Sequence, residues 1–458
     1  MHEPHMLFTG PILAAGDSES RLLIVLVQLA IIIAIARVFA MLFRRIGQPA
    51  VVGEICAGLI LGPSILGKLE AAGWVPHISG YVFDASVAPV LGVMSQLGLI
   101  LLLFLVGLEF DFRHLKSHGR AAMSISIMGI VAPLLLGMGL GHFLHGRLPE
   151  KVDELSFVLF MGVAMSITAL PILGRMMVEM KISRTRVGAI TITSAAVDDA
   201  VGWILLAAVS ALVQSRFNIL HSAGMIGMTV AFAAVMMLVV RPAMKWWIGR
   251  TLARTGGDLS LNALAIVLIV LFVCSIATSL IGIFAIFGAF ILGAVLSDQQ
   301  EFREAVSKAL SGFVTVFFLP IFFTYTGLRT DIGSLHTLEM WLFAAGVMAA
   351  AIAGKFGGCT LAARLSGFSM RESTCIGVMM NTRALMELVV INVGYDLGVI
   401  PQSVFCMLVM MAIGTTLMTT PILQRAMWGT ELEEGFVRSG FARGLRGPAA
   451  EELVAGRA

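Results

Sequence analysis

The chain has 458 residues, of which 58% are hydrophobic and only 13% are charged, and its mean hydropathy is +0.94. Soluble domains carry about 25% charged residues, so this composition excludes an ordinary soluble protein and indicates one that crosses a membrane many times. The apolar runs recur along almost the whole length, which favours helices over the weakly alternating strands of a barrel.

The two ends of the chain are more polar than the rest. Residues 1–20 have no basic region ahead of an apolar run, so we expect an extracytoplasmic N-terminal segment and not a cleaved signal peptide. Residues 429–458 are rich in Gly, Glu and Arg and are predicted to be a disordered cytoplasmic tail. This tail is too short for a nucleotide-binding domain and contains no phosphate-binding motif, so we expect no cofactor and no enzymatic activity.

Hydropathy, turn residues and charges between residues 21 and 428 predict an all-α polytopic membrane domain with about 13 transmembrane helices. The expected spans are 22–43, 50–66, 90–109, 120–145, 156–178, 186–214, 222–248, 260–280, 283–298, 312–328, 339–366, 372–396 and 403–426. With the N-terminus outside, the cytoplasmic segments hold 21 of the 31 Lys and Arg residues and the outer segments hold 6. This bias predicts an inner (cytoplasmic) membrane protein with its C-terminus in the cytoplasm.

Four basic and four acidic residues remain well inside the predicted spans. Charged groups at membrane depth are costly, and they are usually paired and functional. The equal numbers therefore suggest buried pairing, although the sequence does not show which residues pair. The residues are Arg37, Arg175, Lys355, Arg383, Glu54, Asp198, Asp199 and Glu387.

Two adjacent carboxylates, Asp198 and Asp199, occupy the middle of the apolar run 187–213. Neighbouring side chains on a helix point about 100° apart, so one carboxylate can face a packed partner while the other faces a cavity. Burial disfavours the charged form of a carboxyl group, so protons and cations can compete for it. This pair predicts an ion and proton site in a secondary transporter.

Lys355 is the expected partner of these aspartates. Asp198 lies 12 residues, or roughly 18 Å, from Arg186, and Lys355 lies 16 residues, or roughly 24 Å, from Glu339. Both depths are near the middle of a membrane core about 30 Å thick. Two interpretations stay open: a permanent structural ion pair, or a pair that breaks and re-forms as protons and cations exchange.

Two spans carry signs of a helix break. Thr168 precedes Pro171, which removes a backbone donor, and the nearby hydroxyls can bind either freed carbonyls or a cation. Asn381 and Thr382 mark the second expected break. Arg383 and Glu387 follow at i,i+4, where they can form a local salt bridge, either as a self-neutralising structural pair or as part of the site.

The interrupted spans fall in two stretches of opposite orientation, spans 4–6 and spans 11–13. This arrangement is typical of inverted repeats whose two discontinuous helices cross at the middle of the membrane. Half-helix ends there present partial charges that can compensate ions.

These residues resemble those of the monovalent cation:proton antiporter-2 family, the sodium/hydrogen exchanger-domain proteins, without the C-terminal regulatory domain that many members carry. The resemblance covers about residues 40–426. It is carried by the segments Ile46–Pro49 through Gly62-Pro63, Phe104–Glu109, Ser166–Pro171, Val197–Ala200, Gly327–Asp331, Lys355 with Ala362–Arg364, and Asn381–Glu387.

The resemblance implies an elevator-like ion-transport core, from about 120–214 and 339–426, packed against a dimerisation part, from about 22–109 and 260–328, in a homodimer surrounded by lipid. It implies that Asp199 binds the monovalent cation and the proton, that Asp198 pairs with Lys355, and that Thr168 and Asn381–Arg383 lie in the unwound segments. Members with this trio are generally electrogenic and exchange two protons per cation.

The expected function is therefore Na⁺ or K⁺/proton antiport, with no nucleic-acid partner. A cation channel and a transport-inactive sensor or resistance protein on the same fold remain as alternatives. The sequence does not distinguish Na⁺ from K⁺ or Li⁺, because that choice depends on the number of oxygen ligands and on cavity size.

Overall fold

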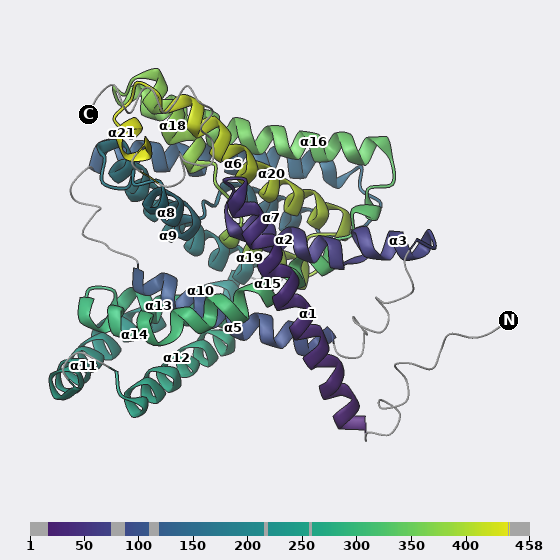
Figure 1. Ribbon diagram of the computed structural model, residues 1–458. Helices are drawn as coiled ribbons and strands as arrows, with labels where there is room; N and C mark the ends of the chain where they lie inside the picture. Colours follow the sequence, from purple (N-terminus) through teal and green to yellow (C-terminus); the bar gives the residue numbers. More distant parts are fainter. Residues whose placement is uncertain are drawn as a thin grey trace.

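The computed structural model describes residues 17–74, 88–109, 119–214, 219–255, 259–437 and 439, and all regular structure within them is helical (Figure 1). Eleven of the described helices are long and apolar enough to cross a membrane, or twelve if a bent pair counts as one span. The ninth predicted span, 283–298, corresponds to the shorter apolar helix Ala285–Leu296. The all-α polytopic fold is confirmed.

The helices form two packed groups, which we call group A and group B. In group A, α1 packs on α2, α2 on α15, α5 on α13 and α15, and α12 on α13. Most of group A, from α10 to α14 with α5, lies below group B in Figure 1. Its helices are α1 (Asp17–Arg45), α2 (Ala50–Leu61), α3 (Lys68–Ala71), α5 (Ala88–Glu109), α10 (Ile219–Val235), α11 (Arg241–Thr255), α12 (Leu261–Ile281), α13 (Ala285–Leu296), α14 (Gln300–Phe313) and α15 (Leu319–Arg329).

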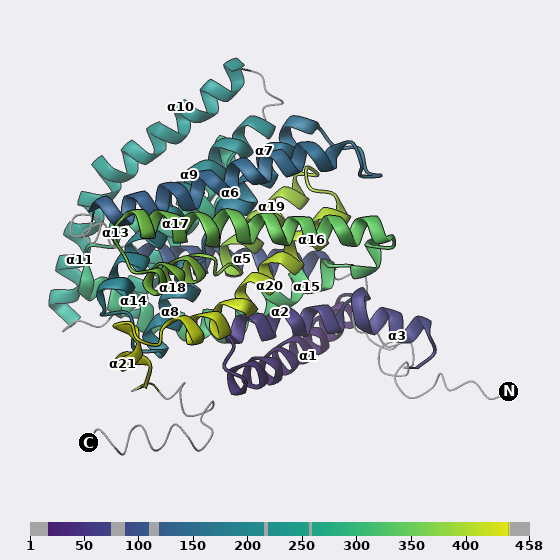
Figure 2. The same cartoon turned by 90° about the horizontal axis from the view of Figure 1, so that it is seen from above.

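In group B, α6 packs on α7, α9 and α17, and α20 packs on α16 and α18. Figure 2 shows α16 and α17 as one long run beside α6. The helices of group B are α6 (Gly119–His145), α7 (Glu154–Ser166), α8 (Leu170–Glu179), α9 (Arg186–Gln214), α16 (Leu338–Ile352), α17 (Gly358–Leu365), α18 (Met370–Met380), α19 (Leu385–Asp396), α20 (Gln402–Ala426) and α21 (Leu432–Val437).

Short π-helical and 3-10 turns connect several of these elements. The π-helical turns are η1 (Pro63–Gly67), η3 (Met236–Val240), η4 (Val314–Phe318) and η6 (Ala353–Gly357), and the 3-10 turn is η5 (Ile332–Ser334). The turn η6 joins α16 to α17 and contains Lys355. π-turns inside helices are frequent at functional sites, because they redirect a side chain without ending the helix.

Small residues allow the membrane helices to approach closely. A Cβ atom on Gly58 of α2 would lie 2.5 Å from the carbonyl oxygen of Thr324 in α15, and one on Gly327 would lie 2.6 Å from the backbone of Gly58. Each glycine therefore admits the backbone of the other helix, as in small-residue packing of membrane helices.

Two discontinuous helices cross in group B, as predicted. The first break lies between α7 and α8, where Ile167–Ala169 is not helical, and Pro171 lies in the first turn of α8. The second lies between α18 and α19, which meet at an angle of 41°. The backbone N–H of Ala169 donates to the carbonyl oxygen of Thr382 (3.2 Å), so the two unwound segments bond directly to each other.

The C-terminal segment differs from its prediction. Instead of becoming disordered at residue 429, the chain forms α21, which buries Leu432 and Phe436 among apolar side chains of group B. Leu432 and Phe436 are four residues apart, so they share one face of a helical turn. Glu431 also accepts a hydrogen bond from the backbone of Val187 at the start of α9 (2.5 Å). Residues 1–16 and 440–458 lie outside the described part of the chain, with the predictions made for them.

Candidate ion-binding site

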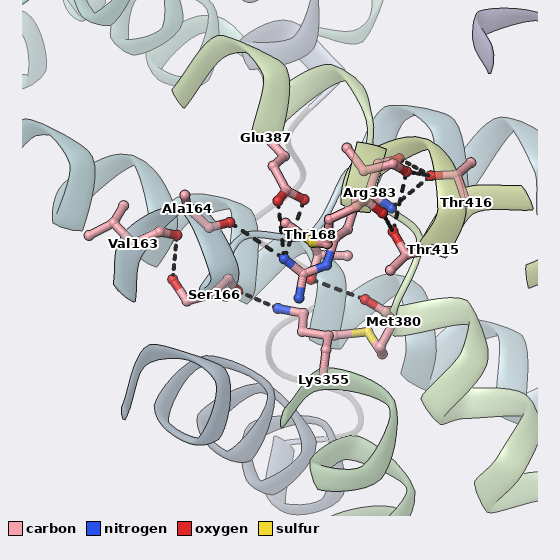
Figure 3. Close-up of polar contacts among 12 residues, drawn as sticks. Val163, Ala164, Ser166, Thr168, Lys355, Met380, Arg383, Glu387, Thr415 and Thr416 are labelled. Carbon is pink, nitrogen blue, oxygen red and sulfur yellow. Dashed lines mark hydrogen bonds and ion pairs between the residues drawn. The ribbon is translucent and has the colours of Figure 1, made fainter. Parts of the chain in front are cut away.

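Asp198 lies at the centre of a buried hydrogen-bond network. Its Oδ1 accepts from the Ser126 hydroxyl (2.5 Å), and its Oδ2 accepts from the Thr168 hydroxyl (2.9 Å) and from Lys355 Nζ (2.7 Å). Asp198 and Lys355 are both 0% exposed. Lys355 also donates to the carbonyl oxygen of Ser166, at the end of α7 (Figure 3). Four elements thus meet at one carboxylate: α6, the first break, α9 and η6.

Asp199, the next residue along α9, has very different surroundings. It is 1% exposed, and neither of its carboxylate oxygens has a hydrogen-bond partner within the described residues. A buried charged group without partners costs several kcal/mol, so such a group persists only where it neutralises itself or receives a counter-ion. Asp199 is therefore the position in this network at which a proton or a cation can be received.

Glycine on α6 allows Lys355 to reach Asp198. A Cβ atom on Gly129 would lie 2.7 Å from Cys359 Sγ and 3.3 Å from Asp198 Oδ2. Gly129 and Ser126 are three residues apart, so they lie on the same face of α6. This face seats the ion pair: the glycine admits the neighbouring helix, and the serine supplies a hydrogen bond.

The second break holds another buried ion pair. Arg383 Nη1 lies 3.3 Å from both carboxylate oxygens of Glu387, and both residues are almost fully buried. Thr416 of α20 fixes the unwound backbone, since its hydroxyl donates to the carbonyl oxygen of Arg383 (2.7 Å). Figure 3 shows the Arg383 guanidinium and the Lys355 ammonium directed into the same space between the two breaks. The Nε and Nη2 atoms of Arg383 have no partner among the described residues.

The other residues predicted at the second break are also buried. The Thr382 hydroxyl lies 3.4 Å from that of Thr419, and its carbonyl oxygen is the one that joins the two breaks. Asn381 is 0% exposed, and its Oδ1 has no partner within the described part of the chain. Backbone strain accompanies this break, because Ala384 has φ +132°, in a region that residues with a side chain rarely adopt.

The charges of the site favour one added positive charge. Asp198, Asp199 and Glu387 are three acids, whereas Lys355 and Arg383 are two bases. With every group ionised, the five side chains carry a net charge of −1. One monovalent cation or one proton makes the set neutral. No cluster of three or more His, Cys, Asp or Glu side chains suited to a resident metal ion occurs among the described residues.

A cavity of about 980 Å³ leads toward this site between groups A and B. Charged side chains line it at one end of the molecule, among them Arg44, Glu109, Arg303 and Glu304. It also reaches Leu170 at the start of α8 and Leu385 at the start of α19, beside the two breaks. Its wall includes Ala196, one helical turn before Asp199, which leaves Asp199 just beyond the lining.

The sequence did not predict several residues that support the site, namely Ser126, Gly129, Thr416 and Thr419, and only Ser126 among them bonds to Asp198. Ser126 lies in the fourth predicted span, 120–145, for which the sequence predicts no site residue, yet its hydroxyl donates to Asp198. The only signal in the sequence is a serine three residues before a glycine in an apolar helix, a pattern common in packed membrane helices.

Comparison with known proteins identifies the family. The model of the sodium/hydrogen exchanger transmembrane family matches residues 30–428. The chain therefore belongs to the sodium/hydrogen exchanger family, as the sequence resemblance indicated, and it is a multi-pass membrane protein.

Individual relatives carry cation/proton antiporter names. The Na(+)/H(+) antiporter NhaS4 of Synechocystis sp. is 38% identical over 407 residues, which are 88% of this chain and 97% of the relative. The Cation/H(+) antiporter 18 of Arabidopsis thaliana is 34% identical over 89% of this chain. The K(+)/H(+) antiporter 1 of Saccharomyces cerevisiae is 30% identical, also over 89%. The chain spans about half the length of these plant and yeast relatives, 50% and 47%.

A solved structure shares the fold. The sodium proton antiporter MjNhaP1 from Methanocaldococcus jannaschii, at pH 8, superposes with a TM-score of 0.56 over 90% of this chain and 98% of its own. The sequence identity is 15%, so this similarity concerns the fold alone.

Proposed function

We propose that the protein is a secondary active antiporter that exchanges a monovalent cation, Na⁺ or K⁺, for protons, and that both compete for Asp199. The observation that carries this proposal is the contrast within α9: Asp199 is buried with both oxygens unpartnered within the described residues, beside an Asp198 that already accepts three hydrogen bonds. The antiporter names of relatives that match 88–89% of the chain support the same activity.

The neighbouring side chains then have distinct roles. Asp198 and Lys355 hold compensating charge beside Asp199, and Thr168 adds a hydroxyl oxygen that can still accept a cation while its proton points to Asp198. Arg383 and Glu387 neutralise each other at the second break. Asn381 offers a buried carbonyl oxygen without a partner among the described residues, which suits a cation that has lost part of its water.

Coupling follows from competition. A cation at Asp199 excludes the proton, and a proton at Asp199 removes the negative charge that binds the cation. An unpaired buried carboxylate is too costly to carry through a dry barrier, so the site crosses only when it is loaded. We propose that group B moves as an ion-carrying core against group A, exposing the site alternately to the two sides of the membrane.

We also propose that exchange is electrogenic, with two protons per cation. If Lys355 stays charged throughout, the five side chains are neutral with either a cation or a proton at Asp199, and exchange moves no net charge. In the other case, cation binding at Asp199 also releases a proton from Lys355, which becomes neutral. The five side chains with the bound cation then carry a net charge of −1, whereas with a proton at Asp199 and a charged Lys355 their net charge is 0. The second proton then travels on Lys355 Nζ, and the resemblance to two-aspartate members favours this case.

We propose that group A forms the contact of a homodimer and that the protein lies in a cell inner membrane with its N-terminus outside. The orientation rests on the excess of Lys and Arg in the predicted cytoplasmic segments. It places the mouth of the cavity, with Arg44 and Arg303, on the cytoplasmic side.

The test is proton flux in liposomes that contain the purified protein, with an imposed pH gradient and Na⁺, Li⁺ or K⁺ added in turn. We expect one or more of these cations to dissipate the gradient, and Asp199→Asn to abolish the response. Asp298→Asn is the matched control, because Asp298 lies in the turn after α13 and bonds only to Arg241, Lys245 and Gln299 in the described structure.

Other outcomes would identify the alternatives. Large ohmic currents without proton coupling would indicate a channel. No response to any cation, with the fold intact, would indicate a transport-inactive sensor or resistance protein. For an electrogenic antiporter, the cation gradient that just balances the pH gradient shifts with an imposed voltage, whereas a one-for-one exchanger shows no such shift.

A further inference from the structure

A second polar cluster lies far from Asp199 and joins groups A and B. Arg329, the last residue of α15, donates through Nη1 to Asn392 Oδ1 (3.0 Å) and through Nη2 to Asp396 Oδ1, both on α19. The Arg329 carbonyl oxygen accepts from Gln402 Nε2 at the start of α20 (2.7 Å). Asn392 Nδ2 also donates to the hydroxyl of Thr326 on α15 (3.0 Å). All four bonds run between group A and group B.

Two aromatic rings hold the guanidinium in place. The Arg329 Cζ atom lies 4.6 Å from the ring centroid of Tyr395 and 5.2 Å from that of Tyr325. The Arg329 side chain is 20% exposed and that of Asp396 is 39% exposed, so the cluster lies at a rim that water reaches. A planar donor that makes hydrogen bonds and stacks at the same time is specific to arginine, and lysine does not replace it fully.

The cluster lies at the end of the molecule opposite the cavity mouth. The helix α15 begins at Leu319, which lines the cavity, and ends at Arg329. Likewise α19 begins at Leu385, which lines the cavity, and ends at Asp396. Ten or eleven residues of helix span roughly 15–17 Å, so the cluster and the cavity lie at different ends of these helices. Beside the cavity, Gln48 Nε2 donates to the carbonyl oxygen of Leu417 in α20 (3.3 Å), whereas the Arg329 cluster joins groups A and B by four hydrogen bonds.

We propose that Arg329 is a positioning residue that closes the far end of the ion path. Its bonds to Asn392 and Asp396 stabilise the state in which the cavity is open, and they must break before the site can open to the opposite side. The strength of the cluster then sets the ratio of the two states, because only interactions that differ between the states shift their equilibrium. This inference rests on the alternating movement in the proposed function.

The experiment measures cavity access directly. Ser311 lines the cavity from α14, and Ser311→Cys places a thiol of nearly the same size there. The native cysteines are buried, except for a half-buried Cys56, and their labelling in the parent protein gives the background. In purified protein carrying Ser311→Cys, Arg329→Gln is expected to slow modification by a water-soluble thiol reagent about tenfold, because the open-cavity state loses charge-assisted hydrogen bonds.

Matched variants separate this effect from a general loss of structure. Arg147→Gln should leave the labelling rate unchanged, since Arg147 bonds and stacks only within residues 143–147 in the described structure and belongs to the same predicted outer side. Arg329→Lys keeps the positive charge but loses the planar guanidinium that donates to Asn392 and Asp396 at the same time, so it should give an intermediate labelling rate. If Arg329→Gln does not fold, as judged by size-exclusion chromatography, Asn392→Ala replaces it.

An unchanged or faster labelling rate in a folded Arg329 or Asn392 variant would overturn the proposal. Labelling needs no cation, no gradient and no transport activity. A failure of the antiport assay therefore leaves this measurement valid, and a failure of this measurement leaves the assignment of Asp199 untouched.

Discussion

Asp198 and Asp199 are adjacent, equally buried and chemically identical, yet they lie in opposite surroundings. Asp198 accepts hydrogen bonds from three side chains on three other elements, and Asp199 accepts none within the described structure. The turn of about 100° between neighbouring residues of a helix is enough to direct one carboxylate into packed protein and the other away from it. A fixed charge and an exchangeable one can thus be built from two consecutive residues.

The other charges inside the spans repeat this difference. Glu54 lies 3.8 Å from Arg37, Asp198 lies 2.7 Å from Lys355, and Glu387 lies 3.3 Å from Arg383. Of the four acids that the sequence places within spans, Asp199 alone has no ion-pair partner in the described part of the chain. Structural neutralisation accounts for three acids and leaves Asp199, the acid to which the proposed function assigns the transported ions.

The largest expected effect separates the two aspartates by function. Asp199→Asn should reduce cation-driven proton flux to the level of empty liposomes while leaving thermal stability unchanged or slightly higher, because it removes an unpartnered charge and no described bond. Asp198→Asn should instead lower stability, because it leaves the Lys355 ammonium buried without an anion. Flux and thermal unfolding in detergent are measured on both variants. Parent-like flux in Asp199→Asn, or an equal loss of stability in both, would contradict the comparison.

The next effect tests the pair itself. Lys355→Ala leaves the Asp198 carboxylate buried without its cation and should destabilise the protein by about 3–5 kcal/mol. The double variant Asp198→Asn/Lys355→Ala should lose less than the sum of the two single changes, since each removes the cost created by the other. Denaturant titration of the three variants measures this coupling. Additive losses would mean that the two side chains act independently, against the 2.7 Å contact.

The sequence indicated the polytopic helical fold, the two broken helices and the charged residues at membrane depth, because each leaves a local mark: an apolar run, a proline or polar break, or a charge where charge is costly. Depth in the membrane made Lys355 the expected partner of the aspartates, and the i,i+4 spacing suggested Arg383 with Glu387. The residues alone did not show which of the two aspartates bonds to Lys355, or that Arg37 lies beside Glu54. Pairing depends on how helices pack, and Asp198 and Lys355 are 157 positions apart.

The sequence also could not supply the contribution of α6. Ser126 is an ordinary residue in a membrane helix, and its role appears only when Gly129 brings α6 against α17 and the ion pair. Similarly, the sequence does not predict α21, because Leu432 and Phe436, four residues apart in a mostly polar segment, are a weak signal until group B provides the surface that buries them.

A smaller effect tests the support that α6 gives to Asp198. Ser126→Ala removes one hydrogen bond to a buried carboxylate and should cost about 1.5–3 kcal/mol of stability. Ser124→Ala is the control, because Ser124 is exposed two residues away on the same helix, and it should change stability by less than about 0.5 kcal/mol. Thermal unfolding of both variants is compared with the parent. Equal midpoints for the two variants would show that the Ser126 bond does not stabilise Asp198.

The smallest effect belongs to a carboxylate that is bonded like Asp198 but lies in water. Asp298 accepts from Arg241 Nη2 (3.0 Å) and Lys245 Nζ (2.5 Å), and its side chain is 36% exposed. Partial burial raises the pKa of Asp298, but the hydrogen bonds from Lys245 and Arg241 outweigh burial and leave the pKa below its usual value. Because solvent screens this cluster, Asp298→Asn should cost less than about 1 kcal/mol at neutral pH.

The pH dependence of that cost tests its electrostatic origin. A carboxyl group whose pKa is lowered by folding stabilises the protein above its unfolded pKa of about 3.9, and the stabilisation disappears as the pH falls through the lower folded value. The unfolding midpoints of the parent and of Asp298→Asn should therefore converge as the pH drops from 7 toward 3. Suppose instead that Asp298→Asn lowers stability as much as Asp198→Asn does. The number of bonds, and not burial, would then determine how much a paired carboxylate stabilises the protein, and burial would no longer explain the difference between Asp198 and Asp199.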